Sequence, residues 1–150
     1  DTVPGLKILA DNIRDRLGVI SFYVPGIHYN LIVRLLNDLY GIQVRGGCAC
    51  AGTYGHLLLE VSHEKSREIT WKINHGDLSE KPGWVRWSLH PTTTDAEVDL
   101  MISGLRHIAE NITELSKLYV YDRHENNFRH LHDDPGSYDQ LMHSWFTLEE

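Results

Sequence analysis

Residues 42–52 read Ile-Gln-Val-Arg-Gly-Gly-Cys-Ala-Cys-Ala-Gly. Residues 42–44 predict a short strand, and the two glycines after it predict a loop, because glycine adopts backbone conformations closed to other residues and lets a ligand come close. The loop would present Cys48 and Cys50 directly behind Arg45. A nearby guanidinium favours the thiolate, which is the nucleophilic form of cysteine. The stretch therefore predicts a reactive sulfur beside an anion-binding arginine.

The composition is that of one ordinary globular domain. Of the 150 residues, 41% are hydrophobic and 23% are charged, and the net charge is −7. The basic residues are scattered, which argues against a surface for nucleic acid or anionic membranes, and no apolar run approaches the roughly 18 residues that span a bilayer. Two cysteines one residue apart would form a strained disulfide, whereas free thiols are typical of the cytoplasm. We therefore expect a cytoplasmic protein without nucleic-acid or membrane partners.

Hydrophobic periodicity predicts alternating helices and strands up to about residue 118. The predicted helices cover residues 6–17, 31–39, 66–74 and 95–112, the predicted strands cover 19–24, 42–44 and 84–89, and residues 57–59 fit either type. Thr94 and Glu97 have the spacing of a capping box at the start of the last helix. This order predicts a small α/β domain of the α+β kind, with a short, largely antiparallel sheet and helices packed on one face.

The last part of the chain has a different character. We expect residues 1–118 to form the domain and residues 119–150 to form a polar, His-rich extension. Within the extension, 119–121 fits a strand, whereas 122–144 carries few apolar anchors and is expected to be partly disordered. Alternatively, the aromatic residues of the tail dock on a partner; these are Tyr138, Trp145 and Phe146.

Two side chains are the leading candidates for chemistry. Cys50 fits either a nucleophile on a mobile loop, activated by Arg45, or a small buried hydrophobic residue. Arg86 lies in the aromatic strand Trp84–Leu89, where its forked head could capture a substrate carboxylate. The competing interpretation is an edge-strand arginine that reaches water.

Histidines near the cysteines allow a metal or redox hypothesis. Cys48, Cys50, His56 and His63 could supply mixed ligands, but their spacing matches no usual zinc arrangement, so we expect no metal site. A noncatalytic metal- or redox-binding module that uses Cys48 and Cys50 stays open as an alternative. His28 precedes the second predicted helix and fits a structural or capping role.

Four blocks of this sequence together resemble a known family. In chain order they are residues 18–22 with 26–28, residues 41–47, residues 50–51, and residues 85–88 followed by 94–98. The set is similar to the small C-terminal domain of a fold-type I pyridoxal-phosphate enzyme, within the class V aminotransferase and cysteine desulfurase family. The chain also lacks an initiator methionine, and we expect it to be a fragment of a longer protein.

The resemblance implies roles for three residues. Cys50 matches the cysteine that accepts sulfur in desulfurases, Arg86 matches the arginine that grips the substrate α-carboxylate, and Arg45 matches a second arginine close to that substrate. It further implies pyridoxal 5'-phosphate as the cofactor, a homodimer, and a small amino-acid substrate. The lysine that binds the cofactor would belong to an N-terminal large domain of the same protein, so this fragment alone would be inactive. The expected reaction is that of a cysteine desulfurase or selenocysteine lyase, with transamination as the alternative.

Overall fold

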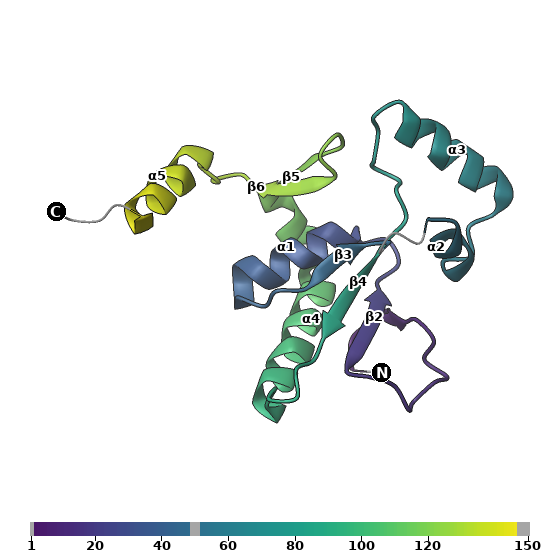
Figure 1. Ribbon diagram of the computed structural model, residues 1–150, viewed down its shortest axis with the longest axis horizontal. Helices are drawn as coiled ribbons and strands as arrows, with labels where there is room; N and C mark the ends of the chain where they lie inside the picture. The colour runs from purple at the N-terminus through teal and green to yellow at the C-terminus, as the bar shows by residue number, and fades with distance from the viewer. Residues whose placement is uncertain (1, 49–51, 147–150) are drawn as a thin grey trace.

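The computed structural model describes residues 2–48 and 52–146 (Figure 1). Along the chain the elements are β1 (Lys7–Ile8), β2 (Val19–Tyr23), α1 (Tyr29–Tyr40), β3 (Arg45–Gly47), α2 (Gly52–Leu58), α3 (His63–Asn74), β4 (Trp84–Ser88), α4 (Asp95–Leu115), η1 (Ser116–Leu118), β5 (Tyr119–Asp122), β6 (Asn127–His130) and α5 (Pro135–Phe146).

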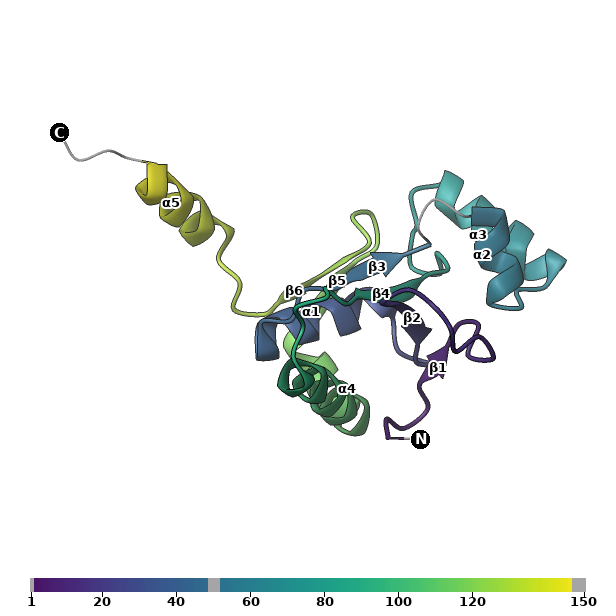
Figure 2. The same cartoon turned by 60° about the horizontal axis from the view of Figure 1, so that its bottom comes forward.

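The main sheet is antiparallel throughout and has the strand order β1-β2-β4-β3. Helices α1 and α4 cover one of its faces, as Figure 2 shows. Phe22 of β2 and Val85 of β4 are paired across the sheet, and both are buried in the core with the apolar face of α1. The predicted α/β architecture, with its short antiparallel sheet and helices on one face, is therefore confirmed.

Local sequence signals fixed most of the elements. Gly41 ends α1 in a left-handed conformation, as a C-terminal glycine is expected to do, and the Thr94–Glu97 capping box opens α4. The ambiguous segment around residue 57 is helical, within α2. The elements confirmed with small shifts in their ends are β2, α1, α3, β4, α4 and β5.

The helix expected over residues 6–17 is wrong. Its first part forms β1, which pairs with the end of β2, and Ala10 adopts a positive φ of 53°. The Arg16 guanidinium accounts for part of the difference, because it donates to the backbone carbonyls of Leu9, Ala10 and Ile13, which a helix would use internally. Leu17 is 86% exposed. Leu6 packs against the core, but Ile13 and Leu17, the later members of the apolar repeat, have no core to face.

The strand expected at residues 42–44 is displaced by three residues. The strand is β3, and it contains the two glycines that predicted a loop. At Gly46 a Cβ would lie 2.4 Å from Oδ1 of Asn30 and 3.0 Å from the Tyr29 ring. Glycine is therefore used here for close packing of β3 on α1.

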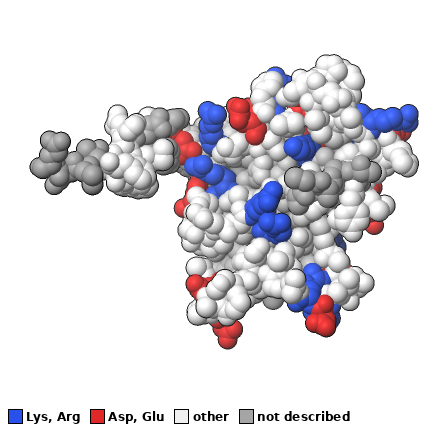
Figure 3. Space-filling view, in the orientation of Figure 1, with Lys and Arg blue, Asp and Glu red and all other residues white. Residues whose placement is uncertain are grey.

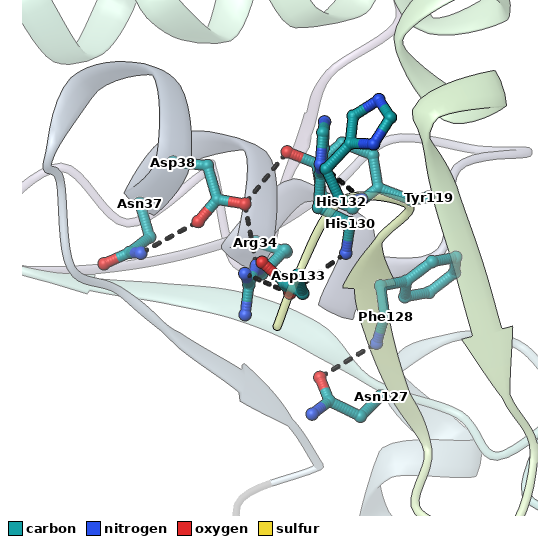
Figure 4. Close-up of polar contacts among 9 residues, drawn as sticks. All are labelled: Arg34, Asn37, Asp38, Tyr119, Asn127, Phe128, His130, His132 and Asp133. Carbon is teal, nitrogen blue, oxygen red and sulfur yellow. Dashed lines mark hydrogen bonds and ion pairs between the residues drawn. The ribbon is translucent and has the colours of Figure 1, made fainter. Parts of the chain in front are cut away.

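The segment after α4 is more ordered than its composition predicts. Strands β5 and β6 form an antiparallel hairpin. Tyr119 donates to Oδ2 of Asp38 at 2.9 Å, and Arg34 forms ion pairs of 2.7 Å with Asp38 and Asp133 (Figure 4). His130 adds a backbone hydrogen bond to Asp133. These contacts attach the hairpin to α1.

Helix α5 lies apart from the rest of the chain in both ribbon views (Figures 1 and 2). Its Trp145 and Phe146 side chains are 67% and 83% exposed. Within the described residues, none of the helices combines the length and apolar character that crossing a bilayer requires.

Candidate functional site

The two arginines singled out from the sequence are brought together by the sheet. Arg45 of β3 is paired directly with Arg86 of β4, and Ser21 of β2 is paired with Arg86 from the other side. Residues opposite each other in an antiparallel pair have Cβ atoms about 4.5–5.5 Å apart on the same face. These three residues therefore form one row across the sheet, which we call the arginine row.

The arginine row lies on the face of the sheet that α1 and α4 leave uncovered. Side chains alternate along a strand, and the neighbouring row, Phe22, Val85 and Gly46, packs against the helices. Arg86 and Arg45 must then point the opposite way. Arg86 is half-buried and Arg45 is exposed. Figure 3 shows basic side chains near the middle of this face, over β3 and β4.

Neither arginine is neutralised by the side chains that the structure describes around it. Among residues 2–48 and 52–146, no side-chain hydrogen bond or ion pair engages Arg45 or Arg86. Like charges directly opposite in a sheet are destabilising, and a carboxylate between two guanidiniums would remove that repulsion. The arginine row is therefore suited to bind a carboxylate or another small anion.

One end of the open face is closed by α2. Trp84, two residues before Arg86, is buried, and a Cβ at Gly55 of α2 would lie 3.3 Å from its indole. The half-buried Cys48, a free thiol, lies at the same end, directly after β3. Cys50, the predicted nucleophile, lies outside the described residues.

Tyr29, which the sequence did not single out, supports this end of the site from the helix side. It is the first residue of α1 and is 6% exposed. A Cβ at Gly83 would lie 2.5 Å from its ring, so the ring packs directly against the backbone that leads into β4. Burial raises the pKa of Tyr29, and the proximity of the Cys48 thiol raises it further.

His28 has the capping role that the sequence indicated. Its Nδ1 accepts a 3.1 Å hydrogen bond from the backbone N–H of Asn30, at the N-terminus of α1. The ring stacks on Tyr29 and contacts Tyr121 and Phe128 of the hairpin. Burial lowers the pKa of His28, which favours the neutral form that can act as the acceptor.

Asn126, at the turn of the β5–β6 hairpin, is a second residue that the sequence did not reveal. Its Nδ2 donates to the Tyr29 hydroxyl at 2.7 Å, and its Oδ1 accepts from the Tyr121 hydroxyl at 2.9 Å. The signal that could have located the turn is Glu125-Asn126-Asn127 between two segments with aromatic residues. Its contact with Tyr29, 97 residues away, leaves no local signal.

The described residues offer little to a metal ion or to pyridoxal phosphate. No group of three or more His, Cys, Asp or Glu side chains among them is placed to hold a metal. The four strands of the main sheet contain no Asp or Glu that could pair with a pyridinium nitrogen. Lys65, Lys72 and Lys117 form ion pairs with glutamates. On the main sheet, the arginine row thus fits a carboxylate, whereas the four strands carry no acidic side chain to pair with the pyridinium nitrogen of the cofactor.

Comparison with family models placed part of the chain in a known family. The model of the family described as "Aminotransferase class-V" matches residues 1–101, a segment that includes the entire main sheet and the arginine row. The β5–β6 hairpin and α5 lie beyond the matched segment. A search of curated proteins found no match.

Proposed function

Because the chain belongs to the class V aminotransferase family, we propose that it is the small C-terminal domain of a pyridoxal-phosphate enzyme acting on an amino acid. The observation that carries the proposal is the arginine row, two adjacent guanidiniums without partners among the described residues. An amino-acid substrate brings the α-carboxylate that this pair lacks. Arg86 grips that carboxylate through its planar fork, and the exposed Arg45 adds a second positive charge.

The reaction we favour is desulfuration of cysteine or selenocysteine. For cysteine, the Cys50 thiolate attacks the substrate sulfur, a sulfur–sulfur bond forms, and the substrate's carbon–sulfur bond breaks. The bonding pair stays with the carbon and is protonated, so cysteine and the Cys50 thiol yield alanine and a Cys50 persulfide. Arg45 favours the thiolate form of the nucleophile. Bound pyridoxal phosphate would supply an electron sink for the reaction.

We propose that cofactor binding requires a further domain of the same protein and that the enzyme contains a second subunit. By the resemblance to the family, an N-terminal large domain would supply the lysine and the phosphate site, and the isolated fragment would be inactive. We assign the enzyme to the cytoplasm as a homodimer. The exposed Trp145 and Phe146 support such association, and sizing of the protein with and without residues 135–150 tests it.

The test of the reaction is sulfide release from L-cysteine by the complete, cofactor-loaded protein. The parent should release sulfide in the presence of a reductant, and Cys50→Ala should abolish the release. Cys48→Ala is the matched control, since it removes the neighbouring thiol. Sulfide release by Cys50→Ala at the parental rate would refute the role of Cys50.

Transamination is the alternative within the same family. The arginine row supports it equally, because an aminotransferase also holds an α-carboxylate. In that case Cys50→Ala should leave amino-group transfer to a 2-oxo acid intact.

A noncatalytic metal- or redox-binding module that uses Cys48 and Cys50 is the alternative outside the family's chemistry. Metal analysis of the purified protein tests it, because stoichiometric zinc would favour this module over both enzymatic proposals.

A further inference from the structure

We propose that Asn126, at the tip of the β5–β6 hairpin, is a positioning residue for the active site, acting through Tyr29 and Asn30 on the strands that carry Arg45 and Arg86. The inference rests on the proposed function for what the site binds. The physical link from the hairpin to the strands rests on contacts alone. Asn126 lies outside the segment matched by the family model.

The first step of the link is the hairpin tip itself. Asn126 has a φ of 52°, in the left-handed region that asparagine tolerates better than most residues. Its side-chain amide donates a hydrogen bond to the Tyr29 hydroxyl and accepts one from the Tyr121 hydroxyl. Its backbone carbonyl accepts from Nδ2 of Asn30 at 2.5 Å. One residue of the hairpin therefore holds the first two residues of α1.

The second step leads from α1 to the strands. Oδ1 of Asn30 and the ring of Tyr29 occupy the space that a Cβ at Gly46 would need, and the Tyr29 ring does the same at Gly83. Gly46 directly follows Arg45, and Gly83 directly precedes β4. Interiors packed this closely transmit displacements, because no void absorbs them. A shift of the Tyr29 ring would therefore move β3 and β4 relative to each other.

The third step is the consequence for binding. The arginine row depends on the register and the separation of β3 and β4, because Arg45 and Arg86 face each other across that pair. Two guanidiniums that share one carboxylate are sensitive to their separation. Loss of the Asn126 contacts should therefore weaken carboxylate binding while leaving the chemical groups in place.

The test uses Asn126→Gly in the complete protein, since glycine accepts the positive φ and removes the side chain without backbone strain. Hydrogen exchange should accelerate at the amides of residues 45–48 and 83–87. The KM for L-cysteine should rise about fivefold, the size of one lost hydrogen bond, with kcat little changed. Tyr29→Phe removes the same hydrogen bond from the other side, so the effects of the two substitutions should be clearly less than additive.

The matched control is Tyr119→Phe, which removes another hydrogen bond between the hairpin and α1, the one that Tyr119 donates to the Asp38 carboxylate at the start of the hairpin. It should speed exchange in the hairpin and leave both the β3–β4 amides and KM as in the parent. Unchanged β3–β4 exchange in Asn126→Gly, or the same KM increase in Tyr119→Phe, would overturn the inference. A parent enzyme that does not act on amino acids would instead refute the proposed function, and the exchange experiment would still decide the positioning link.

Discussion

Arg45 and Arg86 stand directly opposite each other across the β3–β4 pair, with no anionic partner among the described residues. Such a pair lowers stability in the absence of ligand, because two like charges share one row of the sheet. A sheet that only needed to be stable would carry a neutral or acidic residue at one of the two positions. The lost stability follows from placing two positive charges side by side, which is the arrangement that binds an anion.

Arg45→Gln should therefore stabilise the protein, by about 0.2–1 kcal/mol in the free energy of unfolding. The gain should shrink at high salt, where repulsion between the guanidiniums is screened. Urea denaturation at low and high ionic strength measures both effects. Arg67→Gln, at an exposed position of α3, is the control and should give no comparable gain. A loss of stability in Arg45→Gln at low salt would contradict the repulsion.

Gly83→Ala should destabilise the protein by about 1–3 kcal/mol, because the added methyl group would overlap the buried ring of Tyr29, 2.5 Å away. Thermal or urea denaturation measures the loss. Gly136→Ala is a suitable control, since Gly136 is exposed in α5 and its nearest neighbour is the side chain of Asp134. Equal stability of the Gly83→Ala variant and the parent would show that Tyr29 does not pack against this backbone.

The free energy of unfolding should fall as the pH drops below about 6.5, the ordinary pKa of histidine, in part because of His28. Burial lowers the pKa of His28 in the folded state, so the unfolded chain binds the proton more tightly over this range. Protonation of Nδ1 would also remove the acceptor that caps α1. His28→Asn keeps a capping side chain that does not titrate.

The comparison to make is urea denaturation of the parent and His28→Asn between pH 5 and pH 8. The parent should lose more stability than the variant on going to the acid side, and the two should run parallel above about pH 7.5. If the free energies of unfolding of the two proteins changed in parallel over the whole pH range, protonation of His28 would not be linked to folding.

The parts of the fold that are predictable from the sequence are those determined by contacts between residues close together in the chain. Gly41 ends α1, and Thr94 and Glu97 begin α4, through contacts within a few residues. The apolar repeat at 6–17 was misleading, because a repeat predicts a helix only if a core is available to cover it. Leu17 finds none, and the Arg16 side chain takes carbonyls that a helix needs.

The candidate site was predictable in its residues and not in its geometry. Arg45 and Arg86 stood out by type and context, but their pairing depends on strand register, which is set by contacts between distant segments. The glycines at 46 and 47 predict a loop when only their neighbours in the sequence are considered, since nothing nearby indicates that Tyr29 and Asn30 pack against Gly46. Asn126 acts on Tyr29 from 97 residues away.

The most direct measurement of the central claim is the KM for L-cysteine in the complete enzyme and its Arg45→Lys, Arg86→Lys and doubly substituted variants. Lysine keeps the charge and removes the forked geometry. If both arginines hold one carboxylate, each single variant should raise KM, more strongly for Arg86, and the double variant should deviate from additivity. Parental KM in all three variants would contradict the claim.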